Sequence, residues 1–472
     1  MKRLYLLILS LIVATATAEA QTIALTDSAS SQGLIEMLQQ QDLSFNIGAI
    51  LRGVVGMAAL IGIAFLLSKD RKQINWRTVG KALAVQFLIA ISVIAFPAVQ
   101  GCFEFVGKGF IAVLNWTNAG SEFLFGPLVS NSIGYIFAFR VLPTIIFFSA
   151  LTSLLYYLGV LQKVVWAMGW IFSKLMNLSG AESLSCAGNI FLGQTEAPLM
   201  VKAYIPTMTK SEIMLIMVSG MSTMAGGVLA AYIGMLGGGD KLLELEFAKH
   251  LLSASVMAAP GAIAFAKILK PETEKVDTTI TVPRDKVGKN VLDAVSNGTS
   301  DGLRLAANVG AMLLVFYALI AGFNFVCVKF GDLTTLNGVI ESATSGRYDS
   351  LSLECILSYL FYPVIWLTGL PMADVALAGR LLGEKLIMTE FVGYQSLVEM
   401  IQAGVFSNPK SIIMSTYILC GFANFASIGI IIGGVGGLAP NQRPTMSEYG
   451  FVALMGSTLV ALMSTIMVGM II

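Results

Sequence analysis

Two glutamates lie in apolar surroundings where a carboxylate is costly. Glu196 and Glu390 each follow an interrupted apolar stretch. Burying a carboxylate at membrane depth costs about 2.5–3.5 kcal/mol on insertion scales, so such a residue marks function by default. The alternative is a structural acid paired with a base. Lys202 is near Glu196 in sequence, whereas the nearest base to Glu390 is Lys385, beyond a predicted break.

Neutral polar side chains accompany both glutamates. Gln194 and Thr195 directly precede Glu196, and Asn424 and Ser427 are three residues apart, so they share a helix face. Amide, hydroxyl and carboxylate groups suit a neutral solute rich in hydroxyls, and the scarcity of nearby Arg and Lys argues against phosphorylated or carboxylate substrates. Phe422 could stack on a flat base attached to a sugar; packing alone is the alternative.

Oxygen ligands for a hard cation cluster near the first break. Asn189 lies one turn before Gly193, and its side-chain oxygen could join main-chain oxygens near Leu192 and around Thr223 and Met224. Ligands of this type suit Na⁺. The spacing therefore predicts a sodium site beside the solute site.

The composition indicates a membrane protein. Hydrophobic residues make up 56% of the chain and charged residues 12%, about half the usual charged share, while 29 basic and 28 acidic residues nearly cancel. These values exclude a soluble globular enzyme, a disordered chain and a nucleic-acid binder. An intramembrane enzyme would need a nucleophile with its base or a metal cluster, and one His with five scattered Cys offers neither. We therefore predict a protein that is not an enzyme.

Long apolar segments predict eight membrane-spanning helices with both ends outside the cytoplasm. The basic cluster at 69–81 and the polar loop at 270–290 should be cytoplasmic by the positive-inside rule. The predicted spans are 47–67, 79–99, 136–158, 213–236, 247–269, 303–328, 412–438 and 450–472.

Other apolar segments are too short or too interrupted to span. Residues 103–116, 160–176 and 357–367 are typical of interfacial helices. Residues 181–204 and 373–397 are broken by polar side chains, and such backbone survives at membrane depth only when it is buried in protein or lines a cavity. We predict two re-entrant hairpins there.

The two broken regions resemble each other and the resemblance continues downstream. Gly220–Ala225 and Gly421–Ala426 match, and the helices that carry Thr223 and Asn424 are predicted to run in opposite directions. Inverted repeats with broken helices are typical of secondary transporters. The earlier matches pair Ala187-Gly188 with Ala378-Gly379, Leu192-Gly193 with Leu382-Gly383, and Thr195-Glu196 with Thr389-Glu390.

The first residues read as a secretory signal. Lys2 and Arg3 precede a short apolar run and an Ala18-Glu19-Ala20 cleavage motif; the alternative, a first transmembrane helix, is too short to span. The predicted organisation is a signal peptide (1–20), an external tail (21–44), scaffold and interfacial helices (45–177), a first transport repeat (178–269), a cytoplasmic loop with a long scaffold helix and an external loop (270–352), and a second transport repeat (353–472).

Three motifs resemble the concentrative nucleoside transporter family, in order and in spacing. They are Gly193-Gln194-Thr195-Glu196-Ala197-Pro198-Leu199, Thr389-Glu390-Phe391-Val392-Gly393-Tyr394, and Gly421-Phe422-Ala423-Asn424-Phe425-Ala426-Ser427. The resemblance covers about residues 45–472. It implies eight transmembrane helices, two opposed hairpins, interfacial helices, a homotrimer in a bacterial inner membrane, and a transport domain that moves as an elevator.

The resemblance also implies roles for individual residues. Gln194, Thr195 and Glu196 would hold the nucleobase side, and Val228 would line the base pocket. Glu390, Asn424 and Ser427 would bind ribose hydroxyls, with Phe422 packed on the nucleoside. Sodium would be held by Asn189, Leu192, Thr223 and Met224, the last three largely through main-chain oxygens.

Two positions depart from the family pattern. Position 223 is Thr where Ser is expected, which keeps the hydroxyl, and position 393 is Gly where Ala is usual. Asn189 and the Gln194-Thr195-Glu196 triplet favour sodium symport. Proton coupling through Glu196 or Glu390 is the alternative, and a passive channel, which would not accumulate solute, is disfavoured by the inverted repeat.

Overall fold

The structure is a computed structural model that describes residues 47–129, 136–277, 288–344 and 346–472, and every regular element within these ranges is helical. The all-α fold class is therefore confirmed. The predicted signal peptide (1–20) and external tail (21–44) lie outside the described residues. The α-helices are α3 Ile47–Leu67, α4 Trp76–Ala95, α5 Pro97–Phe125, α6 Phe137–Tyr157, α7 Val160–Met176, α8 Gly180–Gly188, α9 Lys210–Ser222, α10 Gly226–Gly237, α11 Lys241–Leu269, α12 Val291–Leu333, α13 Leu336–Ala343, α14 Leu353–Trp366, α15 Val375–Ile387, α16 Glu390–Gln402, α17 Pro409–Leu419, α18 Phe425–Leu438 and α19 Arg443–Gly469.

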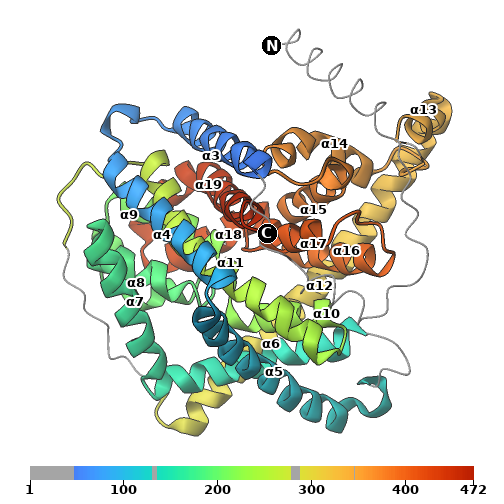
Figure 1. Cartoon of the computed structure of the whole chain (residues 1–472). Helices are drawn as coiled ribbons and strands as arrows, with labels where there is room; N and C mark the ends of the chain where they lie inside the picture. Colours follow the sequence, from blue (N-terminus) through green and yellow to red (C-terminus); the bar gives the residue numbers. More distant parts are fainter. Residues whose placement is uncertain (1–46, 130–135, 278–287, 345) are drawn as a thin grey trace.

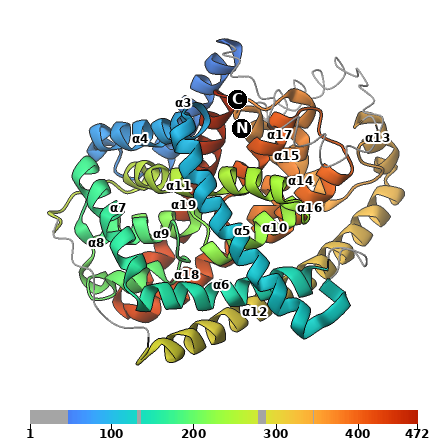
Figure 2. The ribbon, with the colours of Figure 1, turned by 60° about the horizontal axis from the view of Figure 1, so that its bottom comes forward.

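The core of the molecule surrounds α11 and α19. In the most apolar window of α11, 94% of the residues are buried inside the protein, against 6% for α12. Figure 2 shows α12 along the outer edge of the molecule beside α6, whereas α11 and α19 lie near the middle in Figure 1. The apolar surface of α12 is therefore left for lipid or for another chain.

Eight helical segments in the described ranges are long and apolar enough to cross a bilayer, the number that the sequence predicts. All but one of the predicted spans coincide with these segments. α12 begins at Val291, earlier than the predicted span at 303–328. The predicted interfacial segment 160–176 forms a single helix, α7.

The interfacial prediction for 103–116 is wrong, because this segment lies inside the continuous 29-residue helix α5. The segment was predicted to be interfacial because the apolar run is short and contains Glu104 and Lys108. In the structure Glu104 lies 3.6 Å from Lys249 of α11, which compensates its charge. Asp70 accepts a hydrogen bond from Lys270, and Gly107 lies against Ala248, so α4 and α5 together follow α11 in the opposite direction.

The prediction of one continuous helix at 412–438 is also wrong. α17 ends at Leu419 and α18 begins at Phe425. Gly421 has a φ of +87°, a left-handed conformation that suits glycine, and the Asn424 side chain then accepts the Ser427 N–H at 2.8 Å and caps a new helix. The segment at 213–236 is broken in the same way, between α9 and α10.

The two breaks touch each other near the centre of the molecule. A Cβ on Gly421 would lie 2.4 Å from the carbonyl oxygen of Ser222, so only glycine permits this approach. The same order of elements occurs in both halves: a broken hairpin region (α8 with the 3₁₀ helix Ala197–Val201; α15 with α16) precedes a broken long helix (α9–α10; α17–α18). The re-entrant and inverted character of these elements stays a prediction.

Candidate functional site

A chain of polar contacts joins the two halves at their breaks. Gln194 donates from Nε2 to Ser427 Oγ at 3.2 Å, and Asn424 donates from Nδ2 to Glu390 Oε2 at 2.9 Å. Asn424 and Ser427 are linked by the cap of α18. Four predicted substrate-binding residues are thus brought into one continuous network, and all four are buried.

Local backbone structure explains why these side chains converge. Glu390 is the first residue of α16, where the free N–H groups and the helix dipole favour a negative charge. Asn424 is the N-cap of α18. Its side-chain Oδ1 accepts the Ser427 N–H, which leaves the side-chain NH₂ group free to donate to Glu390. The two helix starts face each other through the acid and the amide.

Tyr232 completes the environment of Glu390 and was not predicted. Its hydroxyl donates to Glu390 Oε1 at 3.2 Å, and its ring stacks on Tyr394 with centroids 4.1 Å apart. The signal in the sequence was helical spacing, since Tyr232 is four residues after Val228 and Tyr394 is four after Glu390. Both oxygens of the Glu390 carboxylate therefore accept hydrogen bonds.

Glu196 lies apart from this network. Its Oε2 accepts the Gly193 N–H at 3.1 Å, and its side chain faces a cavity of about 290 Å³ that Leu192 and Val228 also line. The opposite wall comes from α6 and α12, including Phe148 and Asp301. The cavity therefore lies between the predicted first transport repeat and the predicted scaffold helices.

The remaining predicted solute residues lie beside the network. Thr195 packs on Gly434 of α18, where a Cβ would lie 2.6 Å from the threonine Cγ2. Phe422 is partly buried in the break between α17 and α18, and its carbonyl oxygen accepts the Asn424 N–H at 2.9 Å. The structural-acid alternative for the two glutamates is not seen, since neither Glu196 nor Glu390 forms a salt bridge within the described residues.

The predicted cation ligands meet at the other face of the first break. Asn189 donates from Nδ2 to Ser219 Oγ at 2.9 Å, while its Oδ1 is buried with no hydrogen-bond donor among the described residues. Thr223 Oγ1 donates to Ser219 O at 2.9 Å. Leu192 and Met224 are buried close to this turn in sequence. An unpartnered, buried amide oxygen is what a sodium ligand would offer, so these residues fit the ion.

The second half also contains a buried lysine at its break, a position that the sequence analysis did not predict. Lys385 of α15 is fully buried and donates to two main-chain oxygens at the end of α17, Ile418 O at 3.0 Å and Cys420 O at 2.5 Å. Those carbonyls are left open where the helix breaks. Lys385 was treated in the sequence only as a distant base for Glu390.

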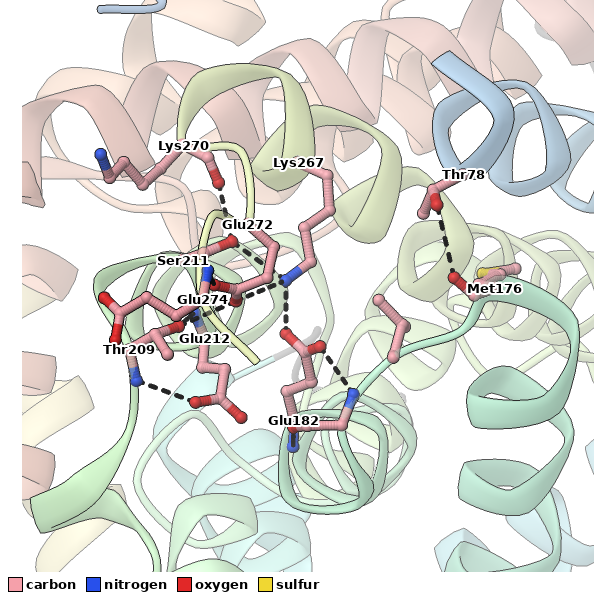
Figure 3. A network of polar contacts seen from close by, with 12 residues as sticks. Thr78, Met176, Glu182, Thr209, Ser211, Glu212, Lys267, Lys270, Glu272 and Glu274 are labelled. Atoms are coloured by element: carbon pink, nitrogen blue, oxygen red, sulfur yellow. Dashed lines mark hydrogen bonds and ion pairs between the residues drawn. The ribbon is translucent and has the colours of Figure 1, made fainter. Parts of the chain in front are cut away.

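A buried ionic network anchors the first hairpin region (Figure 3). The Lys267 ammonium of α11 lies 2.7 Å from Glu182 of α8, 3.0 Å from Ser211 of α9 and 3.7 Å from Glu272. Glu182 also closes the capping box with Ser179. Three elements are therefore tied together at one lysine.

A helical bundle with eight potential spans, buried polar groups at paired helix breaks and a cavity beside them defines a polytopic membrane transporter. Family models match most of the chain: Na⁺ dependent nucleoside transporter N-terminus over residues 55–128, nucleoside recognition over 138–239, and Na⁺ dependent nucleoside transporter C-terminus over 250–469. The chain belongs to the concentrative nucleoside transporter family, whose description gives sodium as the coupling ion.

Relatives from bacteria and mammals agree. An uncharacterized transporter of Haemophilus influenzae is 41% identical over 430 residues, covering 89% of this chain and 98% of its own. The putative nucleoside permease NupX of Escherichia coli is 37% identical over 434 residues, with 89% and 98% covered. Sodium/nucleoside cotransporter 1 of Mus musculus is 35% identical over 434 residues, but the match covers 88% of this chain and 62% of that longer protein.

The fold matches that of a solved transporter. The structure of CNTnw in an inward-facing substrate-bound state has a TM-score of 0.81 and 38% identity, covering 89% of this chain and 99% of CNTnw. Outward-facing and intermediate structures of CNTnw variants match with TM-scores of 0.81 and 0.79. The family and the structural neighbours are transporters and not enzymes.

Proposed function

We propose that this protein imports nucleosides across a bacterial inner membrane by sodium symport. The observation that carries the proposal is the buried chain of contacts from Gln194 through Ser427 and Asn424 to Glu390. It combines hydroxyl, amide and carboxylate groups from both halves, and Gln194 Oε1 has no donor among the described residues. A solute with several hydroxyls and a base edge would satisfy these groups.

The residues have the following proposed roles. Glu390, Asn424 and Ser427 bind the ribose hydroxyls, because a doubly accepting carboxylate beside a capping amide offers strong hydrogen bonds. Gln194, Thr195 and Glu196 hold the base side, Val228 lines the base pocket and Phe422 packs on the nucleoside. The approximately 290 Å³ cavity beside Glu196 and Val228 gives the base side room.

Sodium is the proposed coupling ion, held by Asn189 Oδ1, the Thr223 region and the main-chain oxygens of Leu192 and Met224. The open, buried oxygen of Asn189 supports this assignment. Within the described residues no group of three or more His, Cys, Asp and Glu could hold a metal, so the ligand set is neutral and suits a weakly bound ion that must leave in each cycle.

Proton symport by the same fold is the second candidate. Glu390 is 3% exposed and forms no salt bridge in the described part of the chain, so it is a buried carboxylate whose protonation would remove a charge from the interior. The two candidates differ in the ion that drives uptake and not in the solute.

One uptake experiment separates the candidates. Purified protein in proteoliposomes is offered radiolabelled uridine under an inward sodium gradient or an inward proton gradient. We expect accumulation with sodium alone. Uptake that ignores sodium and follows the proton gradient would replace the first candidate by the second, and equilibration without accumulation would favour a passive channel.

An elevator motion is the proposed route of access. The cavity lies between α6 and α12 on one side and the first hairpin region with α10 on the other, which are parts of the predicted scaffold and transport units. A packing gap along that boundary supports sliding of one unit past the other. CNTnw occurs in inward-facing, intermediate and outward-facing states.

The assembly and orientation are also proposals. The proposed assembly is a homotrimer, in which a second copy would cover part of the apolar surface of α12, a helix with 6% burial in its apolar window. The basic cluster at 69–81 supports periplasmic termini. Chemical crosslinking in membranes should trap three copies, and a ladder that stops at two would refute the trimer.

A further inference from the structure

Lys385 is a buried ammonium without an acidic partner in hydrogen-bond contact. Its side chain is fully buried, its hydrogen bonds go only to Ile418 O and Cys420 O, and it forms no salt bridge within the described ranges. Burying a charge is costly unless hydrogen bonds and nearby charge compensate it. The end of α17 supplies that compensation, since carbonyls at a helix C-terminus carry about half a negative charge.

The equivalent place in the first half is reached by a neutral side chain. In the repeat alignment Gly220 matches Gly421, so Ser219 matches Cys420. Asn189 from the first hairpin region contacts Ser219, and Lys385 from the second contacts Cys420. Each hairpin region thus touches the same turn of the broken helix in its own half, one with an open amide oxygen and the other with an ammonium.

We propose that Lys385 is a tethered cation that does for the second half what the coupling sodium does for the first. Lys385 neutralises the open carbonyls of α17 and holds α15 against the break. In the first half the sodium would balance the oxygens around Asn189 instead, and it must leave in each cycle. The inference rests on the proposed sodium symport. Its consequence is that one sodium ion accompanies each nucleoside, because the second equivalent position is filled by a side chain.

The position of Lys385 also links it to the solute site. It lies five residues before Glu390, across the break between α15 and α16. A fixed positive charge here favours the ionised carboxylate that the proposed ribose contacts need. Lys385 is therefore a positioning residue that does not contact the solute.

The first test is the ion-to-solute ratio of the unaltered protein. Proteoliposomes are loaded with radiolabelled uridine, and the membrane voltage at which net flux reverses is measured at several sodium gradients. We expect one sodium per uridine. A ratio of two would overturn the tethered-cation proposal while leaving sodium symport intact, and a flux that ignores sodium would overturn the proposed function itself.

The second test removes the charge. Lys385→Met keeps the length of the stem but leaves two buried carbonyls open, so we expect sodium-driven uptake to fall roughly tenfold or more. Sodium should still raise the melting temperature of the purified variant as it does for the unaltered protein, because Asn189 is untouched. Unchanged uptake by Lys385→Met would refute the proposal, and loss of the sodium-induced shift would assign Lys385 a general structural role instead.

Lys410→Met is the matched control. Lys410 also donates only to main-chain oxygens at a helix end, Gly469 O at 2.5 Å and Ile472 O at 2.7 Å, but it lies away from both breaks. We expect its uptake and its ion-to-solute ratio to stay within about twofold of the unaltered protein, since it should lose only an ordinary helix-end contact. An equal loss in both variants would mean that helix-end capping in general, and not the position at the break, explains the effect.

Discussion

The two halves of the transporter hold their hairpin regions in different ways. In the first half, Lys267 of α11 ties Glu182 of α8 to Ser211 of α9, so the ion pair connects separate elements. In the second half, Arg380 and Glu384 pair at 2.6 Å within α15 itself. The first hairpin region is therefore tied to neighbouring elements by an ion pair, whereas in the described residues the second is tied to its neighbours by hydrogen bonds, among them those of Lys385, Glu390 and Tyr394.

The two halves also differ in which side chains they place at their breaks. In the first half the neutral Asn189, the proposed sodium ligand, contacts Ser219 near the end of α9, while the ion pair of Lys267 holds other parts of α8 and α9. In the second half Glu390, the proposed ribose ligand, accepts from Asn424, and Lys385 donates to the carbonyl oxygens at the end of α17. Repeats with the same element order can thus divide the labour, one half for the ion and one for the ribose.

The largest expected effect comes from the acid that the second half contributes. Glu390→Gln keeps the size of the side chain but removes the charge that accepts from Tyr232 and Asn424. Losing one charged partner of a buried hydrogen-bonded group costs about 2–5 kcal/mol, so uridine uptake should fall between about thirtyfold and a few thousandfold. Uptake is measured at equal protein density, and Glu399→Gln, an exposed acid on the same helix, is the control. Normal uptake by Glu390→Gln would refute the assigned role.

Anchoring of the first half can be broken directly. Lys267→Met leaves Glu182 buried and unpaired, and breaking a buried pair destabilises by about 3–5 kcal/mol. The melting temperature in detergent should fall clearly, and adding Glu182→Gln should recover part of the loss. Arg380→Met should cost less, because its pair is local and its side chain is 25% exposed. Equal losses in the two variants would remove the contrast between the halves.

The sequence predicted the polar residues of the site better than the helix break that positions them. The motifs around Gln194, Glu390 and Asn424 were found because carboxylates and amides in apolar stretches are rare and therefore conspicuous. The break at Gly421 was hidden, since a glycine in an apolar run is equally compatible with a continuous helix. Its φ of +87° and its contact with Ser222 depend on a partner helix that no local pattern reveals.

The missed features are long-range for the same reason. The Glu104–Lys249 pair, which compensates an acid inside α5, joins residues far apart in the chain. Gly393 shows its use only in three dimensions, because a Cβ there would lie 2.5 Å from Leu419 Cδ2 at the end of α17. The glycine that departs from the family pattern thus lets α16 approach the break.

Ion binding in the first half should respond to a smaller change. Asn189→Ala removes the open Oδ1, and the sodium concentration for half-maximal uptake should rise about tenfold, the effect expected when one good ligand is lost. The uridine concentration for half-maximal uptake at saturating sodium should change little. Asn441→Ala is the control, since that exposed amide donates to Pro206 O, away from the ion site. An unchanged sodium dependence would remove Asn189 from the ion site.

The smallest change tests whether the first half also supports the acid of the second. Tyr232→Phe keeps the ring that stacks on Tyr394 and removes only the hydroxyl that donates to Glu390. One hydrogen bond contributes about 0.5–1.5 kcal/mol, so the half-saturating uridine concentration should rise about two- to tenfold while sodium dependence stays the same. Tyr394→Phe, whose hydroxyl donates to Thr416 O instead, should leave that value nearly unchanged. If Tyr232→Phe shifts sodium dependence and not uridine, the contact across the halves couples the ion to the solute rather than positioning Glu390, and the division between an ion half and a ribose half fails.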